Sequence, residues 1–371
     1  MKRILHYVGS MNHGGMENLI MNVYRNINRN HYQFDFAVHT EEKADMDDEI
    51  ISFGGRIIPF PQFRKNPLHY RKTWDRFWSE NNKTYDVFHF HTDTLANIQA
   101  IRSALKHNVR KIIIHAHSAS TNKGWLQKVH NLIHYKNQIF IANIDTKHII
   151  LASVSDEASQ WVFGEKLFMS DRIQKIQNGV DYQKYYFDNQ MRDSIRKQLN
   201  ISSDDIILGH TGTFVEVKNH KKIIQVFKKL VHDNGRYKLM LIGGGPLLPS
   251  IKQLACDLDL DDRILFLGNL AEVYRYLSAM DVFIFPSLYE GLPLSLIESQ
   301  INELPILASD AISKEVKISE KLFFMSVEKP HEQWAEKICE LSKMDRHIDR
   351  NMINKKFDIK NTVEQFEAMY Q

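Results

Sequence analysis

The sequence contains little cysteine and no long apolar run. Its two cysteines, Cys256 and Cys339, lie far apart without metal-ligand spacing, which argues against a disulfide framework and suits a reducing cytoplasm. No stretch of about 18 consecutive apolar residues occurs, so we expect no membrane-spanning helix. Residues 1–8 have neither the apolar core nor the cleavage site of a signal peptide and predict a first strand instead. These absences predict a cytoplasmic protein.

The charge of the chain is nearly balanced overall but locally one-sided. A net charge of +3 over 371 residues is too small to suggest a nucleic-acid partner. From Thr94 to Ile144, however, the chain has no acidic residue. Its basic residues there are Arg102, Lys106, Arg110, Lys111, Lys123, Lys128 and Lys136. Within this stretch, the Trp125 to Ile133 segment has apolar residues at helical spacing and predicts an amphipathic helix. Two interpretations stay open for it: a solvated positive face, or contact with an anionic membrane surface.

The length and the pattern of the chain predict two α/β domains. A content of 43% hydrophobic and 25% charged residues is typical of globular proteins and excludes a disordered or fibrous chain. Short β-rich runs alternate with helical segments in two series. The first series has expected strands at 4–8, 34–38, 56–59, 87–91, 111–115, 140–143 and 149–154. The second has them at 206–210, 238–242, 264–267, 282–285 and 305–308. We predict two facing Rossmann-like domains, with a cleft between them and ligands beyond the carboxyl ends of the strands.

The expected division of the chain follows from a turn-like sequence between the two series. Asn178-Gly179-Val180-Asp181 has the composition of a turn. We therefore expect an N-terminal domain over 1–177 and a C-terminal domain over 178–345. Residues 346–371 should form a C-terminal helical segment that packs back on the N-terminal domain.

The most informative segment for chemistry lies in the second series, after its fourth strand. A strand ending in Phe285 is followed by a loop with Glu290, then by a helix that carries Glu298. Pro293 suits the first helical turn, and the free amides of Leu294 and Ser295 would form an anion site at the helix N-terminus. Carboxylates beside a phosphate site are explained if they bind hydroxyl groups. The plainer alternative is that Glu290 is only a capping acid at the helix N-terminus and Glu298 only a solvated residue of the helix.

The two glutamates, separated by seven residues, resemble the E-x7-E motif of retaining family-4 glycosyltransferases with the GT-B fold. The resemblance extends over nearly the whole chain, and several further segments carry it in the family's order. These are Gly14-Gly15-Met16-Glu17, His115-Ala116-His117-Ser118, Asn178-Gly179-Val180-Asp181, Lys218-Asn219-His220, Gly243-Gly244-Gly245-Pro246 and Phe266-Leu267-Gly268. Each motif alone is weak, but their order and spacing are specific. Among subgroups, the chain looks most like bacterial capsule and exopolysaccharide enzymes.

The resemblance implies a function and a role for each matching residue. A sugar would move with retention from a nucleotide-sugar, usually UDP-linked, to a glycan or polyprenyl-diphosphate-linked acceptor. By position, Glu298 would bind the ribose and Glu290 a hydroxyl of the donor sugar, while Lys218 would stabilise the diphosphate leaving group. The acceptor's lipid would place the enzyme at the inner face of the cell membrane.

Glycines and one threonine complete the implied donor site. Gly14 and Gly15 would let the backbone approach the donor at a helix N-terminus, although the same pair is more often only a turn. Thr213 stands in Gly212-Thr213-Phe214 where the family usually has an arginine, so one cation is missing beside the diphosphate. Arg275 is a candidate to replace it.

Four histidines raise the question of a metal. His89 and His91 alternate at one strand end, as do His115 and His117 at another. No suitable acid cluster accompanies them, so paired loop histidines with ordinary hydrogen bonds are the preferred interpretation. The resemblance implies instead that His117 lies in the cleft and bonds the donor sugar.

Other candidate metal ligands give no support for a metal site. Asp-x-Asp patterns at 45–47 and 257–259 fall in polar, helix-like stretches that we interpret as solvated faces. GT-B enzymes of this type generally need no bound metal, so the resemblance implies a metal-independent enzyme without a cofactor.

Two other functions remain open on the sequence. The GT-B fold also serves nucleotide-sugar epimerases and phosphorylases, since a fold does not decide a function. The missing cation at Thr213 also permits a degenerate, non-catalytic protein that only binds nucleotide sugars.

Overall fold

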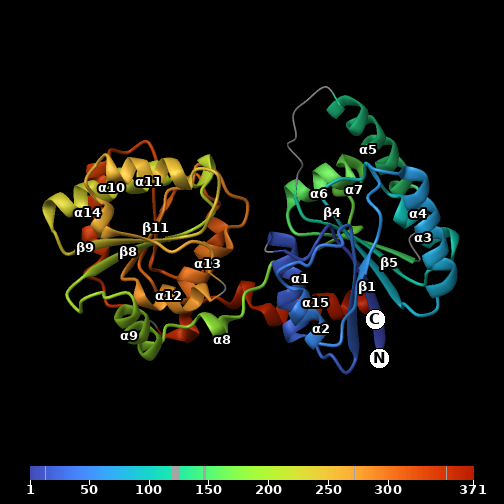
Figure 1. Ribbon diagram of the computed structural model, residues 1–371, viewed down its shortest axis with the longest axis horizontal. Helices are drawn as coiled ribbons and strands as arrows, with labels where there is room; N and C mark the ends of the chain where they lie inside the picture. Colours follow the sequence, from blue (N-terminus) through green and yellow to red (C-terminus); the bar gives the residue numbers. More distant parts are fainter. Residues whose placement is uncertain (13, 119–125, 145–147, 271, 348) are drawn as a thin grey trace. The chain divides into compact units, whose positions relative to one another are not determined.

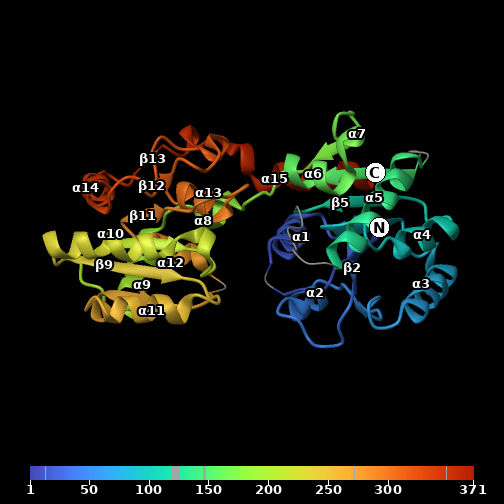
Figure 2. The same ribbon diagram turned by 90° about the horizontal axis from the view of Figure 1, so that it is seen from above.

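The computed structural model describes residues 1–12, 14–118, 126–144, 148–270, 272–347 and 349–371. The chain forms two compact units (Figures 1 and 2). Unit 1 comprises Met1–Gly179 and Ile359–Gln371, and unit 2 comprises Val180–Asp358. Each unit has a parallel sheet between two layers of helices, the arrangement expected of α/β chains.

Unit 1 contains a seven-stranded parallel sheet in the order β3-β2-β1-β4-β5-β6-β7. The strands are β1 (Lys2–Tyr7), β2 (Tyr32–Val38), β3 (Ile57–Pro59), β4 (Val87–Thr92), β5 (Ile112–Ala116), β6 (Ile149–Ser153) and β7 (Ile173–Lys175). One face carries α1 (Gly15–Asn26), α2 (Asp47–Ser52) and α15 (Ile359–Tyr370). The other carries α3 (Pro67–Asn81), α4 (Gln99–Lys106), α5 (Leu126–Ala142), α6 (Asp156–Phe163) and α7 (Glu165–Phe168).

The last helix, α15, belongs to unit 1 although it follows all of unit 2 in the chain. Phe366 and Tyr370 are buried in the core on the α1 side of the sheet. The ammonium of Lys2 donates to the carbonyl of Tyr370 at 2.8 Å, and that of Lys111 donates to the carbonyl of Met369 at 3.1 Å. Two cations therefore bind the carbonyl end of the helix, where its dipole favours positive charge.

Unit 2 contains a six-stranded parallel sheet in the order β10-β9-β8-β11-β12-β13. The strands are β8 (Ile206–Thr211), β9 (Tyr237–Ile242), β10 (Ile264–Phe266), β11 (Val282–Phe285), β12 (Ile306–Ser309) and β13 (Leu322–Met325). One face carries α10 (His220–Asp233), α11 (Leu248–Cys256) and α14 (His331–Leu341). The other carries α9 (Asn189–Gln198), α12 (Val273–Ala279) and α13 (Leu294–Ile301).

The division of the chain differs from the expected one at residues 346–358. We expected them to leave the second domain, but they lie in unit 2. The guanidinium of Arg346 explains the difference, because it donates to the carbonyls of Leu277 at 2.9 Å and Ser278 at 3.0 Å. The segment around Gly179 is more than a turn: Val180 pairs with Asp358, so the chain enters and leaves unit 2 at one place.

The strand expected at 140–143 is wrong. These residues are the end of α5, whose last helical residue is Ala142. His134, Asn137 and Ile141 are buried on one side of this helix at a spacing of three and four residues. A short apolar run such as 140–142 does not by itself distinguish a strand from the buried end of a helix.

The topology places two pairs of loops where ligands usually bind. In unit 2 the chain runs outward from β8 through β9 to β10, then returns to the other side of β8 with β11. In unit 1 it makes the same reversal between β1 and β4. Because the strands are parallel, the loops after β8 and β11 leave the same edge of the sheet, at the topological switch point.

Candidate functional site

Backbone contacts between the loops after β8 and β11 build the centre of the candidate site in unit 2. The first loop contains the short 3-10 helix η2 (Glu216–Lys218). The amide of Leu288 donates to the carbonyl of Val217 at 2.8 Å, and the side-chain amide of Asn219 donates to the carbonyl of Pro286 at 3.2 Å. These bonds hold Lys218 beside the loop that carries Glu290.

Lys218 and Glu290, two of the predicted site residues, contact each other directly. The Nζ atom of Lys218 lies 2.6 Å from Oε1 of Glu290, and the two side chains are only 17% and 15% exposed. The same ammonium lies 5.0 Å from the centre of the Phe285 ring. A cation and a carboxylate are thus held in a half-buried place, where their electrostatic interactions are stronger than in water.

A third loop, after β9, closes against the first because two glycines permit it. Gly243 and Gly245 have φ angles of +138° and +144°. A Cβ atom on Gly243 would lie 2.1 Å from the carbonyl oxygen of Gly212, and one on Gly245 would lie 2.7 Å from the amide nitrogen of Phe214. The Gly-Gly-Gly-Pro segment therefore supports the backbone around Thr213, whose side chain is exposed.

Helix α13 presents its N-terminus and an unusual glutamate. Pro293 is the N-cap, and Leu294 and Ser295 are the first helical residues, so their amides lack intrahelical acceptors. One turn on, burial raises the pKa of Glu298 to about 7, although a hydrogen bond with Tyr185 and the charge of Lys184 lower it in part. The ionised form of an acid with such a pKa is poorly solvated, so hydrogen bonds from a ligand would stabilise it.

Several buried polar atoms that the sequence analysis did not identify lie at the ends of β8 and β11. Within the described residues, His210 Nε2, Thr211 Oγ1 and Ser287 Oγ have no hydrogen-bond partner. A Cβ on Gly212 would lie 3.0 Å from that His210 nitrogen. Burial and the nearby His220 and Lys218 hold the pKa of His210 well below its usual range. Unpaired buried polar groups are costly, which favours a polar ligand there. Polar residues ending an otherwise apolar strand were the available signal.

Arg275 does not stand free to replace the missing cation. Its guanidinium pairs with the carboxylate of Glu272 at 2.9 Å, in the same short helical turn. Among the described residues, Lys218 is a cation that lies between the loops after β8 and β11.

In unit 1, the predicted glycines begin α1. Gly14 is the N-cap and Gly15 the first helical residue. A Cβ on Gly14 would lie 2.2 Å from a carboxylate oxygen of Glu17, whereas one on Gly15 would meet nothing within 4 Å. Gly14 thus makes room for Glu17, and Gly15 leaves the helix start open. Burial, and to a lesser extent the charge of Asp93, raise the pKa of Glu17.

His117 follows β5 at the same edge of the unit 1 sheet. Its amide donates to the carbonyl of Thr92 at 3.1 Å, and its ring Nε2 lies 2.8 Å from Nδ1 of His91. Burial lowers the pKa of His117 to about 3. The ring is therefore neutral at physiological pH, and we expect it to bind through hydrogen bonds rather than to act as a base.

Three of the four histidines are not loop residues, which corrects the sequence interpretation for them, and only His117 lies in a loop. His89 and His91 lie within β4 and His115 lies within β5, all buried, and His6 of β1 joins them. Ligand atoms of His6, His89 and His91, and those of His91, His115 and His117, lie within 4.8 Å of one another. The strand register predicts such a cluster, since parallel pairing aligns alternate residues on one face.

One of the two Asp-x-Asp patterns also differs from its expected place. Asp47 is buried rather than solvated, and its carboxylate accepts a hydrogen bond from the amide of Ala44 at 2.9 Å.

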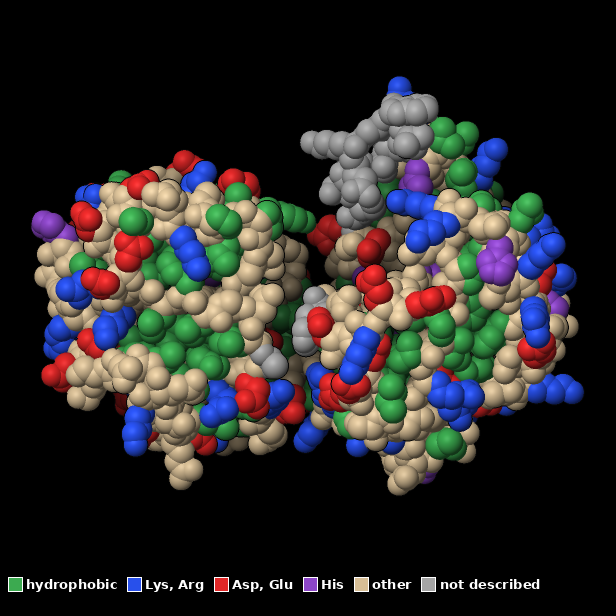
Figure 3. Space-filling model, in the orientation of Figure 1, with side chains coloured by type: hydrophobic (Ala, Val, Ile, Leu, Met, Phe, Trp, Pro, Cys, Tyr) green, Lys and Arg blue, Asp and Glu red, His purple; other side chains and the backbone are tan. Residues whose placement is uncertain are grey.

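The described part of α5 exposes both apolar and basic side chains. Trp125 lies outside the described residues, but the helix from Leu126 to Ala142 has no acidic residue. The exposed apolar side chains are Val129, Leu132, Ile133, Tyr135 and Ile139. Hydrophobic side chains lie among Lys and Arg on this side of unit 1 (Figure 3). No helix in the described ranges is long and apolar enough to cross a bilayer.

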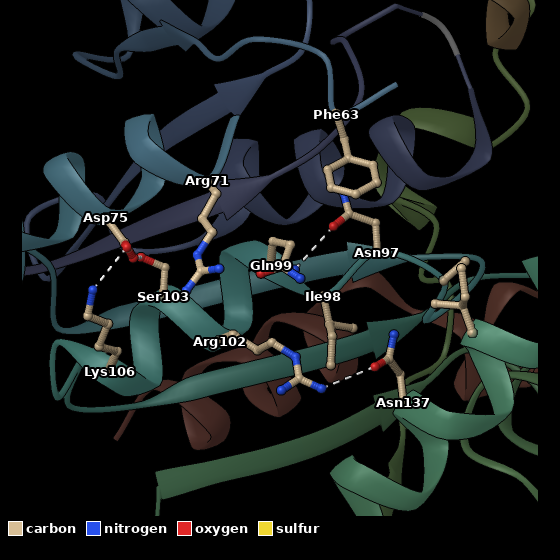
Figure 4. A pocket seen from close by; sticks show the side chains of 12 residues that line it. Phe63, Arg71, Asp75, Asn97, Ile98, Gln99, Arg102, Ser103, Lys106 and Asn137 are labelled. Atoms are coloured by element: carbon tan, nitrogen blue, oxygen red, sulfur yellow. Dashed lines mark hydrogen bonds and ion pairs between the residues drawn. The ribbon is translucent and has the colours of Figure 1, made fainter. Parts of the chain in front are cut away.

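A cavity of about 550 Å³ lies against α5 and is bordered by α3 and α4. Figure 4 shows basic side chains around it: Arg71, Arg102 and Lys106. Lys106 pairs with Asp75 at 3.0 Å, and Arg102 donates to the side chain of Asn137 at 3.3 Å. Within the described residues no pairing partner is found for Arg71, which leaves a net positive lining.

The predicted site residues thus fall into two groups, one in each unit. Unit 2 holds Lys218, Glu290, Thr213, Leu294, Ser295 and Glu298 around the switch-point loops. Unit 1 holds Gly14, Gly15 and His117 at the carboxyl edge of its sheet.

Comparison with known proteins identifies the family. A family model described as "Glycosyltransferase Family 4" matches residues 13–184, and one described as "Glycosyl transferases group 1" matches residues 191–357. "Putative glycosyltransferase EpsF" of Bacillus subtilis (strain 168) is 32% identical over 342 residues, covering 91% of this chain and 87% of EpsF. The "Capsular polysaccharide biosynthesis glycosyltransferase CapH" of Staphylococcus aureus is 25% identical over 379 residues, covering 100% of this chain and 99% of CapH.

Solved structures show the same fold. The crystal structure of Anabaena HepE in complex with UDP superposes with a TM-score of 0.76 at 16% identity and covers 99% of both chains. Because the superposition covers nearly all of both chains, it shows that the two proteins share their fold. The extent of the match to EpsF and the two family models show that the chain belongs to the family-4 glycosyltransferases with the GT-B fold.

Proposed function

We propose that this protein is a retaining glycosyltransferase of bacterial surface polysaccharide synthesis that uses a UDP-sugar and a lipid-linked glycan acceptor. The Lys218–Glu290 pair at the switch point of unit 2 is the observation that carries the proposal. A diphosphate needs a cation and backbone donors, and a sugar needs hydroxyl acceptors. Unit 2 offers both within one set of loops. The names of CapH and of HepE in complex with UDP support the pathway and the nucleotide.

The roles of the residues follow from this geometry. The ammonium of Lys218 would turn to the diphosphate, assisted by the amides of Leu294 and Ser295 at the start of α13. Glu290 would then be released to accept a hydrogen bond from a hydroxyl of the donor sugar. Glu298 would accept hydrogen bonds from the ribose hydroxyls. Donor binding thus exchanges an internal ion pair for two interactions with the ligand.

The transfer step would take place on one face of the sugar. As the bond from the anomeric carbon to the diphosphate breaks, negative charge develops on the departing oxygen, where Lys218 stabilises it. That oxygen can accept the proton of the attacking hydroxyl. His117 contributes a hydrogen bond to the donor sugar, and its low pKa makes it a poor base. The exposed Thr213 can add a hydroxyl but no charge.

The acceptor and the membrane would meet unit 1 at α5. Its exposed apolar side chains suit the boundary between headgroups and acyl chains. The adjacent basic cavity can hold an anionic phosphate, with Arg71 available for it. Lys128 and Lys136 add attraction to an anionic surface. This arrangement supports peripheral association with the inner face of the membrane.

A product assay tests the proposal against its rivals. The full chain is incubated with a panel of UDP-sugars and polyprenyl-diphosphate-linked acceptors, and the products are separated and analysed by NMR. The proposal expects a new α-linkage from an α-configured donor. An inverted linkage would contradict retention. Release of an epimerised free sugar without acceptor would indicate an epimerase, and phosphate-dependent cleavage of a glycan would indicate a phosphorylase. Binding without turnover across the panel would indicate a non-catalytic protein.

A further inference from the structure

Histidine side chains form a continuous hydrogen-bonded series inside unit 1. Nδ1 of His6 lies 2.9 Å from Nε2 of His91, and Nδ1 of His91 lies 2.8 Å from Nε2 of His117. His6 and His91 are at most 2% exposed. The series thus begins in the core of the sheet and ends at the ring that the proposed function places against the donor sugar.

The three rings are neutral near pH 7. Burial lowers the pKa of His6 and of His117 to about 3 each, and burial together with the neighbouring histidines holds the pKa of His91 well below its usual range. A neutral imidazole carries one N–H and one bare nitrogen, so it donates at one ring position and accepts at the other.

These bonds leave only two self-consistent proton arrangements. If His91 carries its proton on Nδ1, it donates to Nε2 of His117 and accepts from Nδ1 of His6, so all three rings are protonated on Nδ1. If His91 carries its proton on Nε2, both bonds reverse and all three rings are protonated on Nε2. A mixed arrangement would set two donors or two bare nitrogens against each other across less than 3 Å, which costs a buried hydrogen bond.

We propose that His6 and His91 are positioning residues that set the tautomer of His117, so that the three rings share one tautomer and change it together. The Nδ1 of His117, for which no partner is found in the described ranges, is then a donor in one state and an acceptor in the other. A ligand hydroxyl at His117 selects the state of the whole series without any change of charge. The role of His117 toward the sugar rests on the proposed function, whereas the coupling of the tautomers does not.

A metal ion explains the three rings less well. Two nitrogens bound to one tetrahedral zinc at about 2.0–2.1 Å lie about 3.3 Å apart, which is longer than the two separations of 2.8 and 2.9 Å. The two ligand groups contain only histidines, so no carboxylate in them balances a divalent charge.

A second histidine branch supplies a matched control. His89 lies between Nδ1 of His115, at 3.2 Å, and the hydroxyl of Tyr370, at 3.0 Å, and has no hydrogen bond to the first series within the described residues. The rings of His115 and His117 are nevertheless close, with centroids 4.4 Å apart. His115 is as deeply buried as His6, so substituting either removes an equally buried imidazole.

The experiment is nitrogen-15 NMR of the full chain labelled at histidine, at pH 7 with a chelator and without donor. Long-range proton–nitrogen spectra distinguish protonated from bare ring nitrogens. We expect one tautomer for His6, His91 and His117, with no imidazolium among them. Different tautomers within the three, or a charged His91 or His117, would overturn the proposal, as would new nitrogen shifts at His91 and His117 on adding zinc.

Two variants test the coupling directly. His6→Phe, in a site already packed against Phe34 and Phe36, should change the tautomer ratio of His117 at least twofold, because His6 reaches His117 through His91. His115→Phe should leave that ratio unchanged despite its nearer ring. The reverse pattern would refute the coupling, and the wild-type spectrum decides if His6→Phe does not fold. If the tautomers couple but His6→Phe leaves the donor KM unchanged, the coupling holds and the donor role of His117 fails.

Discussion

Nζ of Lys218 and Oε1 of Glu290 lie 2.6 Å apart between the loops after β8 and β11. The ammonium and the carboxylate thus pair with each other. Each charge compensates the other, so the two half-buried side chains avoid the cost of an uncompensated charge. In the proposed function, a donor that brings both negative phosphates and sugar hydroxyls would replace each partner at once. We therefore expect this pair to open when such a ligand binds.

The first prediction concerns Glu290→Gln. The variant keeps the shape of the side chain but removes the charge that holds a sugar hydroxyl, so transfer should fall about 100- to 1,000-fold. Binding of the nucleoside diphosphate should persist, because Lys218 keeps its charge. Initial rates and calorimetric affinity are the measurements. Glu340→Gln is the control. Glu340 also pairs with a lysine, Lys337, at 2.7 Å, but both residues belong to α14 and not to the loops of the proposed site. Near-normal turnover by a folded Glu290→Gln protein would remove Glu290 from the site.

The second prediction treats Lys218 and Thr213 together. Lys218→Ala should cost on the order of 2.7–4 kcal/mol in the transition state, the range for one preorganised donor. Thr213→Arg should tighten nucleoside diphosphate binding. Position 213 is exposed beside the same loops, so an arginine side chain fits there and restores the cation. Monophosphate affinity should change much less in both. Calorimetry with both nucleotides measures this.

The control for Lys218 is Lys221→Ala, in the first turn of α10. Its ammonium lies 4.0 Å from an exposed carboxylate of Glu216, and the side chain is 65% exposed. Its loss should change neither affinity nor rate. Equal diphosphate affinity in wild type and Lys218→Ala would show that the leaving group lies elsewhere.

The third prediction is a pH dependence set by Glu298. Burial raises the folded-state pKa of this acid from its usual 4.5 to about 7. Between those values the folded protein binds more protons than the unfolded chain, so this group makes stability fall as pH rises from about 4.5 to about 7. Glu298→Gln should therefore stabilise the protein at pH 8 by up to about 3.4 kcal/mol, at 1.36 kcal/mol per pKa unit, and do little at pH 5.

Nucleotide binding should show the opposite slope. Ribose hydroxyls donate to the ionised carboxylate, so uridine nucleotide affinity should rise as pH increases through about 7, with proton release on binding. Calorimetry at pH 6 and pH 8 in two buffers measures both effects. Affinity that stays flat with pH in wild type, or that keeps its slope in Glu298→Gln, would separate Glu298 from the ribose.

The fourth prediction concerns the α5 surface. Leu132→Asp and Ile139→Asp put charges on an exposed apolar face, so binding to vesicles of anionic phospholipid should fall about tenfold or more, the effect of roughly 1.4 kcal/mol. Ile51→Asp is the control, because Ile51 is 59% exposed in α2, much like the 63% of Ile139. Sedimentation with vesicles measures binding. An equal loss of vesicle binding in all three variants would mean that exposed apolar area in general, rather than the α5 surface, determines membrane association.

The sequence predicted most strands because their apolar runs are short, bounded and fully buried. The strand 282–285 has the predicted bounds, and most others shift by one or two residues. Two failures have physical reasons. The run at 140–142 is too short to reveal its period, and it ends a helix. The strand β7, with the sequence Ile-Gln-Lys, has a single apolar residue and therefore too little pattern to be found, whereas β13 was missed although its four residues are apolar.

The site was predictable as a set of residues but not as a set of contacts. The positions of Lys218 and Glu290 came from the family resemblance, and no sequence pattern shows that they pair. The burial of Glu298 and the unpaired Ser287 hydroxyl depend on packing between elements distant in the chain. The histidine series depends on strand register, which joins His6 to His91 across 85 positions.

A thermal-shift screen of the wild-type chain with nucleotides and nucleotide sugars tests most directly whether unit 2 holds a nucleotide-sugar site. A ligand that binds the folded state at 100 times its Kd adds about 2.7 kcal/mol of stability. For a domain of this size that corresponds to roughly 5–10 °C in Tm. We expect such a rise with UDP and at least one UDP-sugar, and little with UMP. No rise with any nucleoside diphosphate or nucleotide sugar at millimolar concentration would contradict the site and with it the proposed function.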